Sequence, residues 1–316
     1  MIHTTPVNPN ATPEATALLQ YLHDIAGTNI LAGQHTQTNP MEEVAYIETV
    51  TGKSPKLCGF ELLAYSPNIR MEDASEACRI EVEENRNTMD TALRWANETG
   101  GIVTLTFHWF SPLGGHDKSF YTEHTDFDAE RVLHHGTPER AAFFHDLDAI
   151  AVQLQRFQDA KIPVLWRPFH EAEGTWFWWG AKGAEVAKQL YLLMYEHYVH
   201  HYHLDHLLWV WNSRLPEGYP GDDFVDVVSV DVYLPHYEAT DYAADYQALI
   251  AASNANKVAA LAEIGFLSVK ELLSGAESAG LELWEYVLRA SADETGISTE
   301  HSWAQMAARL EAMKKA

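Results

Sequence analysis

Short apolar runs alternate with amphipathic stretches along nearly the whole of this chain. Each run has the length and the composition of a buried strand, and the stretch after it repeats its apolar residues at helical spacing. Such alternation predicts parallel strands joined by crossover helices. We expect eight strands, at residues 29–33, 56–63, 101–107, 162–168, 207–211, 225–233, 258–264 and 283–288.

The stretches between these strands predict helices, and together they indicate one architecture. Eight strands with helices between them fit an α/β fold, a single (β/α)8 TIM barrel with its active site at the C-terminal ends of the strands. The chain has no Pro/Ser-rich linker, no internal repeat and no low-complexity segment, so we expect residues 1–316 to form one domain. The clearest helical patterns cover residues 74–97, 138–159, 184–203, 241–254 and 269–274.

One connection, residues 110–137, is long and has no clear periodicity. Insertions of that kind after a barrel strand usually shape the substrate cleft. Polar side chains also stand where the predicted strands end. Each of them alone could be a loop residue or a hydrogen-bonded core residue, but together they predict a functional face. They are His35, His108, Trp109, His170, Glu171, Trp211, Asn212, Asp231, Tyr233 and Glu263.

The segment from Trp166 to Gly180 combines four of the ten tryptophans with an arginine, a histidine and two glutamates. Indole faces stack on the C–H faces of sugar rings, and a carboxylate beside them can move a proton at a glycosidic oxygen. The alternative is a plain core with Glu171 as a capping residue, but this would bury many polar groups that need partners. A zinc pattern H-E-x-x-H is excluded because Gly174 stands at the second histidine position.

Two of the strand-end groups, Glu171 and Glu263, form a natural acid and nucleophile pair. A retaining glycosidase needs one carboxyl group with a raised pKa and one that stays ionised. Glu171 lies among indoles, which favour its neutral form, whereas hydrogen bonds could keep Glu263 ionised, with Tyr233 as the expected donor. Glu173 is an alternative acid, but we expect its position beyond the strand end to point it elsewhere.

The amino-acid composition limits the kinds of partner that we expect for this chain. With 21 Lys and Arg against 45 Asp and Glu, the chain has a formal charge of −24, which argues against nucleic acid and anionic membranes as partners.

The two cysteines of the chain, Cys58 and Cys78, are too few for a disulfide framework, so we expect free thiols. No apolar stretch is long enough to span a bilayer and the N-terminus has no secretion-signal pattern, so we expect the chain as given to be soluble. A location in the cytoplasm stays open, and so does secretion if a leader was removed.

The 17 histidines raise the question of a metal site. The densest groups are His134–His135 and residues 200–203, and the second lies at the end of a helical pattern, where the helix dipole favours histidine. No strand end offers the paired ligands of a metallohydrolase barrel, so we expect neither a metal nor another cofactor.

The segment Arg167-Pro-Phe-His-Glu-x-x-Gly-x-Trp-Phe-Trp-Trp-Gly180 resembles the acid/base signature of glycoside hydrolase family 26, best known for endo-β-1,4-mannanases. The resemblance extends, in the family's order, over about residues 15 to 290. The further matching motifs are Gly33-Gln-His35, Phe107-His-Trp109, Trp209-Val-Trp-Asn212, Val230-Asp-Val-Tyr233 and Ala262-Glu-Ile-Gly265.

This resemblance implies a (β/α)8 barrel that cleaves β-1,4-mannan, glucomannan or galactomannan with net retention. Glu171 would be the acid/base and Glu263 the nucleophile, with His170 touching the sugar at subsite −1. Tyr233 would lie beside the nucleophile, and His108 and Trp176 would line the same cleft. We also expect substrate contacts from neighbouring residues in these motifs, namely Trp109, Arg167, Trp179, Trp211 and Asn212.

Other functions stay open at this point. The same machinery could act on mixed-linkage glucan or β-1,3-xylan, or from chain ends on manno-oligosaccharides. A barrel that only binds glycan would lack the carboxylates that this sequence retains. We expect a monomer. The chain departs from the family pattern at Ala172 and Glu173, where a Met/Asn-type pair is common, and at Ala290, where a second tryptophan is usual and whose place Trp303 could take.

Overall fold

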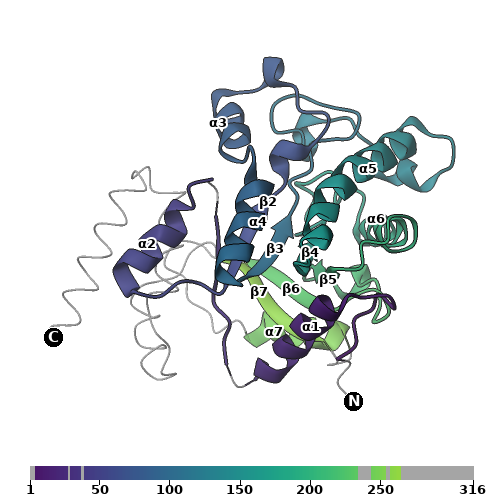
Figure 1. The fold of residues 1–316 in the computed structure, drawn as a ribbon. Coiled ribbons are helices and arrows are strands. Elements are labelled where there is room, and N and C mark those ends of the chain that lie inside the picture. The colour runs from purple at the N-terminus through teal and green to yellow at the C-terminus, as the bar shows by residue number, and fades with distance from the viewer. Residues whose placement is uncertain (1–3, 28, 37–38, 234–242, 254–256, 265–316) are drawn as a thin grey trace.

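The computed structural model describes residues 4–27, 29–36, 39–233, 243–253 and 257–264, which form one curved sheet with helices around it (Figure 1). Within these ranges seven strands form a single parallel sheet, and each pairs with its neighbours in the sequence. This order is that of a barrel wall built from successive strand–helix units. The strands are β1 (Gly33–His35), β2 (Leu57–Glu61), β3 (Ile102–Thr106), β4 (Val164–Arg167), β5 (Leu207–Asn212), β6 (Val227–Val232) and β7 (Val258–Ile264).

The predicted α/β barrel is confirmed for this curved part of the wall, and both ends of six strands lie within two residues of the predicted bounds. The prediction for the first strand was wrong, because the apolar residues at 30 and 31 do not pair and Ile30 is 63% exposed. Pairing begins at Gly33 and brings His35 beside Gly59, where an added Cβ would come within 2.4 Å of the imidazole. The eighth predicted strand and the helix at 269–274 lie outside the described residues.

The helices confirm the predicted alternation of strands and helices, with two corrections. The stretch 74–97 forms two helices rather than one, because Asn87 adopts a left-handed conformation with φ +66°. The stretch 184–203 is α-helical only to Glu196 and continues as a π-helical turn, η5 (His197–His201). The helices are α1 (Pro13–Ile25), α2 (Glu42–Thr51), α3 (Glu76–Glu84), α4 (Thr88–Thr99), α5 (Pro138–Asp159), α6 (Ala184–Glu196) and α7 (Ala243–Ala252).

The sequence patterns had not indicated α1 and α2. Thr12 caps α1 by accepting a hydrogen bond from the backbone of Ala15, and Pro13 occupies the first turn. Its buried leucines pack against apolar side chains at the N-terminal ends of the strands, so α1 closes the bottom of the barrel (Figure 1). Short 3-10 turns complete the connections: η1 (Leu63–Tyr65), η2 (Met71–Asp73), η3 (Thr122–His124), η4 (Ala129–Leu133) and η6 (Pro216–Gly218).

Strand alternation explains why one face of each strand changes from apolar to polar. Side chains two residues apart share a face. On β4, β5 and β6 the face that meets α1 begins with Leu165, Leu208 and Val227, and two or four residues later the same face carries Arg167, Asn212 and Asp231. The barrel interior is therefore apolar at its base and polar at the C-terminal ends of the strands.

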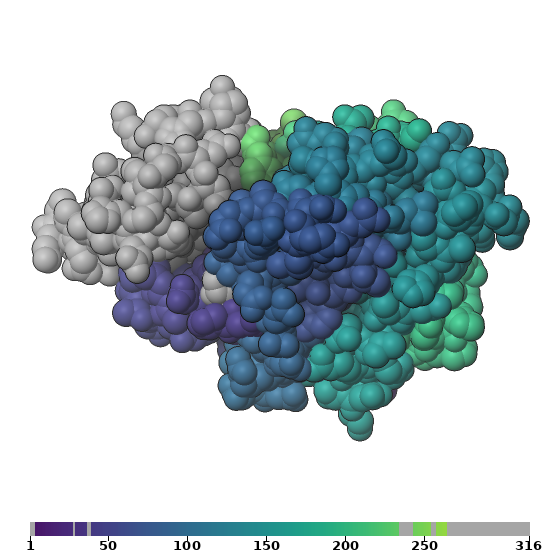
Figure 2. Space-filling model, turned by 90° about the horizontal axis from the view of Figure 1, so that it is seen from above, coloured from purple at the N-terminus to yellow at the C-terminus, as the bar shows by residue number. Residues whose placement is uncertain are grey.

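The opposite face of these strands packs against the surrounding helices. Trp166 is fully buried and its Nε1 lies 3.3 Å from Sδ of Met194 on α6, while Trp209 packs against Tyr191 and Tyr195. Cys58 on β2 and Cys78 on α3 are both buried and free, which confirms the expectation of free thiols. Seen from above, the blue and teal segments around β2 to α5 make up most of the visible face (Figure 2).

Candidate active site

A cavity of about 470 Å³ lies at the C-terminal ends of the strands. Six of the eleven residues expected at the site line it: His108, His170, Glu171, Trp176, Tyr233 and Glu263. They come from positions between 108 and 263 of the sequence, and the curved sheet brings them to one opening. Its remaining lining residues are Tyr121, Glu173, Phe177, Arg214 and Asp231.

Glu171 follows β4 in a strained turn that aims its carboxyl group into the cavity. Both Phe169 and Glu171 have left-handed backbones, with φ of +50° and +53°, a conformation that costs free energy in residues other than glycine and is concentrated at functional sites. The backbone N–H of Glu171 donates to Oδ1 of Asn212 at 2.7 Å, and Nε1 of Trp176 donates to its Oε2 at 2.7 Å. Burial raises the pKa of Glu171, and the charge of Glu263 raises it further.

Glu263 at the end of β7 has a different environment. Nη2 of Arg167 donates to its Oε1, and the hydroxyl of Tyr233 donates to its Oε2 at 2.7 Å. The expected donor role of Tyr233 is therefore confirmed. An adjacent guanidinium and two donated hydrogen bonds favour the carboxylate form of Glu263. The two carboxyl groups share one cavity, one in surroundings that favour the acid and the other in surroundings that favour the base.

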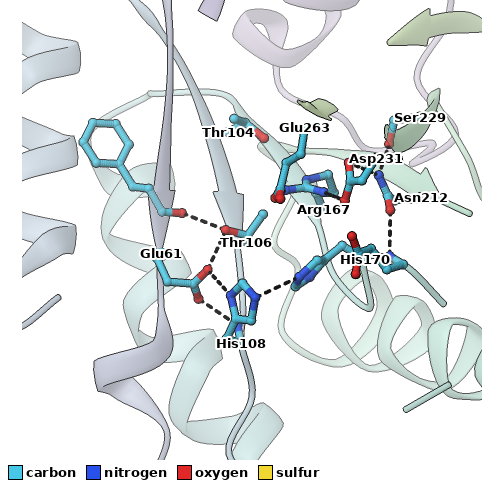
Figure 3. A network of polar contacts seen from close by, with 12 residues as sticks. Glu61, Thr104, Thr106, His108, Arg167, His170, Asn212, Ser229, Asp231 and Glu263 are labelled. Atoms are coloured by element: carbon cyan, nitrogen blue, oxygen red, sulfur yellow. Dashed lines mark hydrogen bonds and ion pairs between the residues drawn. The ribbon is translucent and has the colours of Figure 1, made fainter. Parts of the chain in front are cut away.

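Below these two groups a chain of buried hydrogen bonds connects β4, β5 and β6 (Figure 3). Arg167 is 3% exposed, and its Nη1 donates to Oδ2 of Asp231 at 2.7 Å. Oδ1 of Asp231 accepts a bond of 2.9 Å from Nδ2 of Asn212, whose own Oδ1 holds the backbone of Glu171. Burial raises the pKa of Asp231, against the stabilising effect of Arg167.

Two histidines form another wall of the cavity, and a carboxylate on β2 orders them (Figure 3). Oε2 of Glu61 lies 2.8 Å from Nδ1 of His108, and Nε2 of His108 lies 3.1 Å from Nε2 of His170. Burial works against charge on Glu61, yet His108 lowers the pKa of Glu61 to about 2. Burial likewise opposes charge on His108, but Glu61 raises its pKa overall.

His170 differs from His108 in the direction of its pKa shift. Burial and the neighbouring cations His108 and Arg167 hold the pKa of His170 well below its usual range. The bond between the two Nε2 atoms needs one ring to donate and the other to accept, and these shifts favour His108 as the donor and His170 as the acceptor. Glu61 was missed by the sequence reasoning, although it is the single carboxylate inside the apolar run that forms β2.

Five residues expected to bind substrate do not line the cavity. Arg167 and Asn212 face the barrel interior but are buried beneath it. Trp211 stands one residue before Asn212, so strand alternation turns it outward, where it packs on Tyr219. The other two indoles are also buried and donate hydrogen bonds to the protein, Trp109 to Asp146 at 2.8 Å and Trp179 to the carbonyl of His170 at 2.9 Å.

The cavity also contains residues that the sequence reasoning did not place there. The long connection contributes Tyr121, which stacks on Phe177 and forms an antiparallel bridge with it, so this connection shapes the cleft as expected. Glu173 was expected to point elsewhere but lines the cavity, because the N–H of Gly174 donates to the carbonyl of Glu171 and the turn bends the chain back. Arg214 follows β5 and lies 3.5 Å from Asp245.

The remaining clusters differ from this site. His200 and His201 lie in the π-helical turn after α6 and not at a strand end. In the part of the chain that the structure describes, no three His, Cys, Asp or Glu side chains are grouped so that they could hold a metal ion. No helix within the described ranges is both long and apolar enough to cross a membrane.

Comparison with known proteins agrees with this geometry. A curated mannan endo-1,4-beta-mannosidase of Thermothelomyces thermophilus is 42% identical over 281 residues, which cover 86% of this chain and 54% of that protein. A mannan endo-1,4-beta-mannosidase of Bacillus subtilis strain 168 is 30% identical over 255 residues, covering 73% of this chain and 67% of that protein. The chain thus spans about half the length of the Thermothelomyces relative.

Solved structures give the same result. The GH26-CBM35 β-(1,4)-mannanase of Podospora anserina is 40% identical with a TM-score of 0.75, over 88% of this chain and 60% of that one. A β-mannanase from a symbiotic protist of the termite Reticulitermes speratus, solved with a gluco-manno-oligosaccharide, is 27% identical with a TM-score of 0.76, over 96% of this chain and 94% of that one. The model of glycosyl hydrolase family 26 matches residues 7–292. This chain belongs to glycosyl hydrolase family 26.

Proposed function

We propose that this protein is a retaining endo-β-1,4-mannanase that hydrolyses mannan, glucomannan or galactomannan by double displacement. The observation that carries the proposal is the pair Glu171 and Glu263, which line one cavity in opposite electrostatic surroundings. Support for mannan as the substrate comes from the names of the relatives and of the similar solved structures, several of which are mannanases.

In the first step of the proposed reaction, Oε1 or Oε2 of Glu263 attacks the anomeric carbon of the sugar. The bond from that carbon to the leaving oxygen breaks, and Glu171 gives its proton to this oxygen. The raised pKa of Glu171 keeps the proton available, and Arg167 and Tyr233 keep Glu263 ionised. In the second step Glu171, now a base, takes a proton from water, which attacks the same carbon and releases Glu263.

The other cavity residues would bind and orient the sugar. Trp176 is 47% exposed, so its ring is available for stacking while its Nε1 holds Glu171. His108 and His170 would present two imidazoles with opposite pKa shifts to sugar hydroxyls. The buried residues Arg167 and Asn212 would act through Glu263 and Glu171 by fixing their positions.

Three other functions compete with this proposal. The same pair of carboxylates could act on mixed-linkage glucan or β-1,3-xylan, or at chain ends of manno-oligosaccharides. A barrel that only binds glycan would not need an acid and an anion in one cavity, and both are present here. We further propose that the protein acts as a monomer without a cofactor, which sedimentation and activity after prolonged chelation would test.

Incubation with mannan, mixed-linkage β-glucan and β-1,3-xylan, followed by sizing of the products, tests the function. We expect rapid shortening of mannan to a mixture of oligosaccharides, and proton NMR at early times should show the β-anomer as the first product. Release of only mannose or mannobiose would replace endo by exo action. Cleavage of glucan or xylan in preference to mannan would overturn the substrate, and an α-anomer would overturn the mechanism.

A further inference from the structure

One guanidinium at the base of the cavity donates hydrogen bonds to two carboxylates. Arg167 donates through Nη2 to Glu263 and through Nη1 to Asp231, and its side chain is 4% exposed (Figure 3). Asp231 borders the cavity, but its side chain is completely buried, whereas that of Glu263 is 14% exposed there. The arginine is therefore shared between an anion that the substrate can reach and an anion enclosed by the protein.

The position of Asp231 follows from the sheet. The pairing of β6 with β7 shifts register between Val230 and Asp231, which sets Asp231 opposite Glu263. Oδ1 of Asp231 accepts a hydrogen bond from Asn212 and Oδ2 accepts one from Arg167. Since both oxygens accept, the geometry fits the ionised carboxylate and leaves no place for a proton between Asp231 and its partners.

The reaction changes the charge on only one of the two carboxylates. When an oxygen of Glu263 bonds to the anomeric carbon, the glutamate becomes a neutral ester, and the electron pair of the broken bond leaves with the oxygen that Glu171 protonates. Arg167 keeps its positive charge throughout. A buried guanidinium with no anionic partner is strongly unfavourable, so another anion must compensate it while the ester exists.

We propose that Asp231 is the permanent counter-ion of Arg167, which keeps the guanidinium paired and in place while Glu263 alternates between carboxylate and glycosyl ester. Asp231 transfers no proton and does not touch the substrate, so it is a positioning residue that acts through Arg167. A second effect follows, because an arginine shared with Asp231 holds the negative charge of Glu263 less tightly and leaves it more reactive. This inference depends on the proposed role of Glu263 as the nucleophile.

Two variants separate the charge of Asp231 from its hydrogen bonds. In Asp231→Asn the new amide cannot satisfy both neighbours, because Asn212 and Arg167 both donate toward it. In the double variant Asn212→Asp with Asp231→Asn, the donor and acceptor roles are exchanged. The carboxylate introduced at position 212 accepts from the backbone N–H of Glu171 and from the amide introduced at position 231, and the oxygen of that amide accepts from Arg167. The hydrogen bonds that join Glu171, positions 212 and 231, and Arg167 therefore return, the bond from position 212 to Ser229 is lost, and the charge moves away from the arginine.

The measurement is the rate at which 2-deoxy-2-fluoro-β-mannosyl fluoride labels the protein, with the labelled residue identified by mass spectrometry and folding checked by thermal melting. The wild type should be labelled on Glu263. We expect Asp231→Asn to be labelled at least about ten-fold more slowly, and the double variant to melt nearer to the wild type but to remain about as slow.

Each outcome has one meaning. Labelling of the double variant within about two-fold of the wild type, or of Asp231→Asn at the wild-type rate, would overturn the counter-ion role and leave the proposed function intact. Failure of both variants to fold would assign the ion pair to barrel stability and would also overturn it. A wild type labelled elsewhere than on Glu263, or not labelled, would overturn the proposed function itself and the inference with it.

Discussion

The indole Nε1 of Trp176 donates a hydrogen bond of 2.7 Å to Oε2 of Glu171. The two residues are five positions apart in the connection after β4, and the strained backbone at Glu171 lets the chain bend so that they meet. One side chain therefore both holds the proposed acid and offers a partly exposed aromatic face to the cavity. The contact also favours the carboxylate form of Glu171 and so opposes the effects of burial and of Glu263 on its pKa.

Replacing this indole by a ring that cannot donate should shift the pH profile. Glu171 must be protonated in the first step, so loss of its proton sets the alkaline limb of kcat/KM. In Trp176→Phe the carboxylate loses a donor, the pKa of Glu171 rises further, and the alkaline limb should move to higher pH as the rate falls. Trp179→Phe is the matched control, because its indole donates to a carbonyl of His170 and not to Glu171. A downward shift in Trp176→Phe would contradict the contact.

Two tryptophans of the segment from Trp166 to Gly180 should differ in the effect that their replacement has on activity and on stability. Trp176 is 47% exposed, so Trp176→Ala should cut kcat/KM on mannan strongly while the melting temperature stays close to that of the wild type. Trp166 belongs to β4 and is fully buried, so Trp166→Ala should reduce the free energy of unfolding by about 3–5 kcal/mol. Melting curves and initial rates of both variants test this pattern. If Trp176→Ala lost stability and kept normal turnover, the indole would belong to the core.

The pair of Glu61 and His108 should make stability depend on pH. The pKa of Glu61 is lowered to about 2, so its contribution exists above its ordinary value of 4.5 and is lost as the pH falls toward 2. The pKa of His108 is raised, so its contribution is full below 6.5 and is lost as the pH rises through the folded value. Both contributions are therefore complete between about pH 4.5 and 6.5.

Glu61→Gln removes this pair and should cost about 2 kcal/mol at about pH 5.5, because it leaves a partly buried histidine without its anion. The loss should be smaller at about pH 9, because the contribution of a histidine with a raised pKa is lost as the pH rises. Chemical denaturation of both proteins at the two pH values measures the difference. An equal loss at both values would mean that Glu61 acts through packing and its neutral hydrogen bonds, and not through charge.

Much of the fold and the main part of the site could be predicted because both depend on local patterns. The apolar runs gave the strands, and a polar residue at the end of a parallel strand reaches the barrel mouth wherever it stands in the chain. Glu171, Glu263 and the donor Tyr233 were found in this way. The free cysteines followed from their number and positions.

The features that could not be predicted depend on the direction in which a side chain points or on a partner that is far away in the sequence. Trp211 and Asn212 are adjacent, and only the strand register decides that one faces the helices and the other the barrel interior. Glu173 enters the cavity because of one turn hydrogen bond. Glu61 gains its role from His108, which is 47 residues away, and the first strand depends on the fit of His35 against Gly59.

The most direct test of the account is the single-turnover release of dinitrophenolate from an activated aryl β-mannoside by two alanine variants. This leaving group needs no proton, so Glu171→Ala should still release a burst of one equivalent and then stall, because the base for the second step is missing. Glu263→Ala has no nucleophile and should release none. A burst from Glu263→Ala, or equal silence of both folded variants, would contradict the assignment of Glu171 as acid/base and Glu263 as nucleophile.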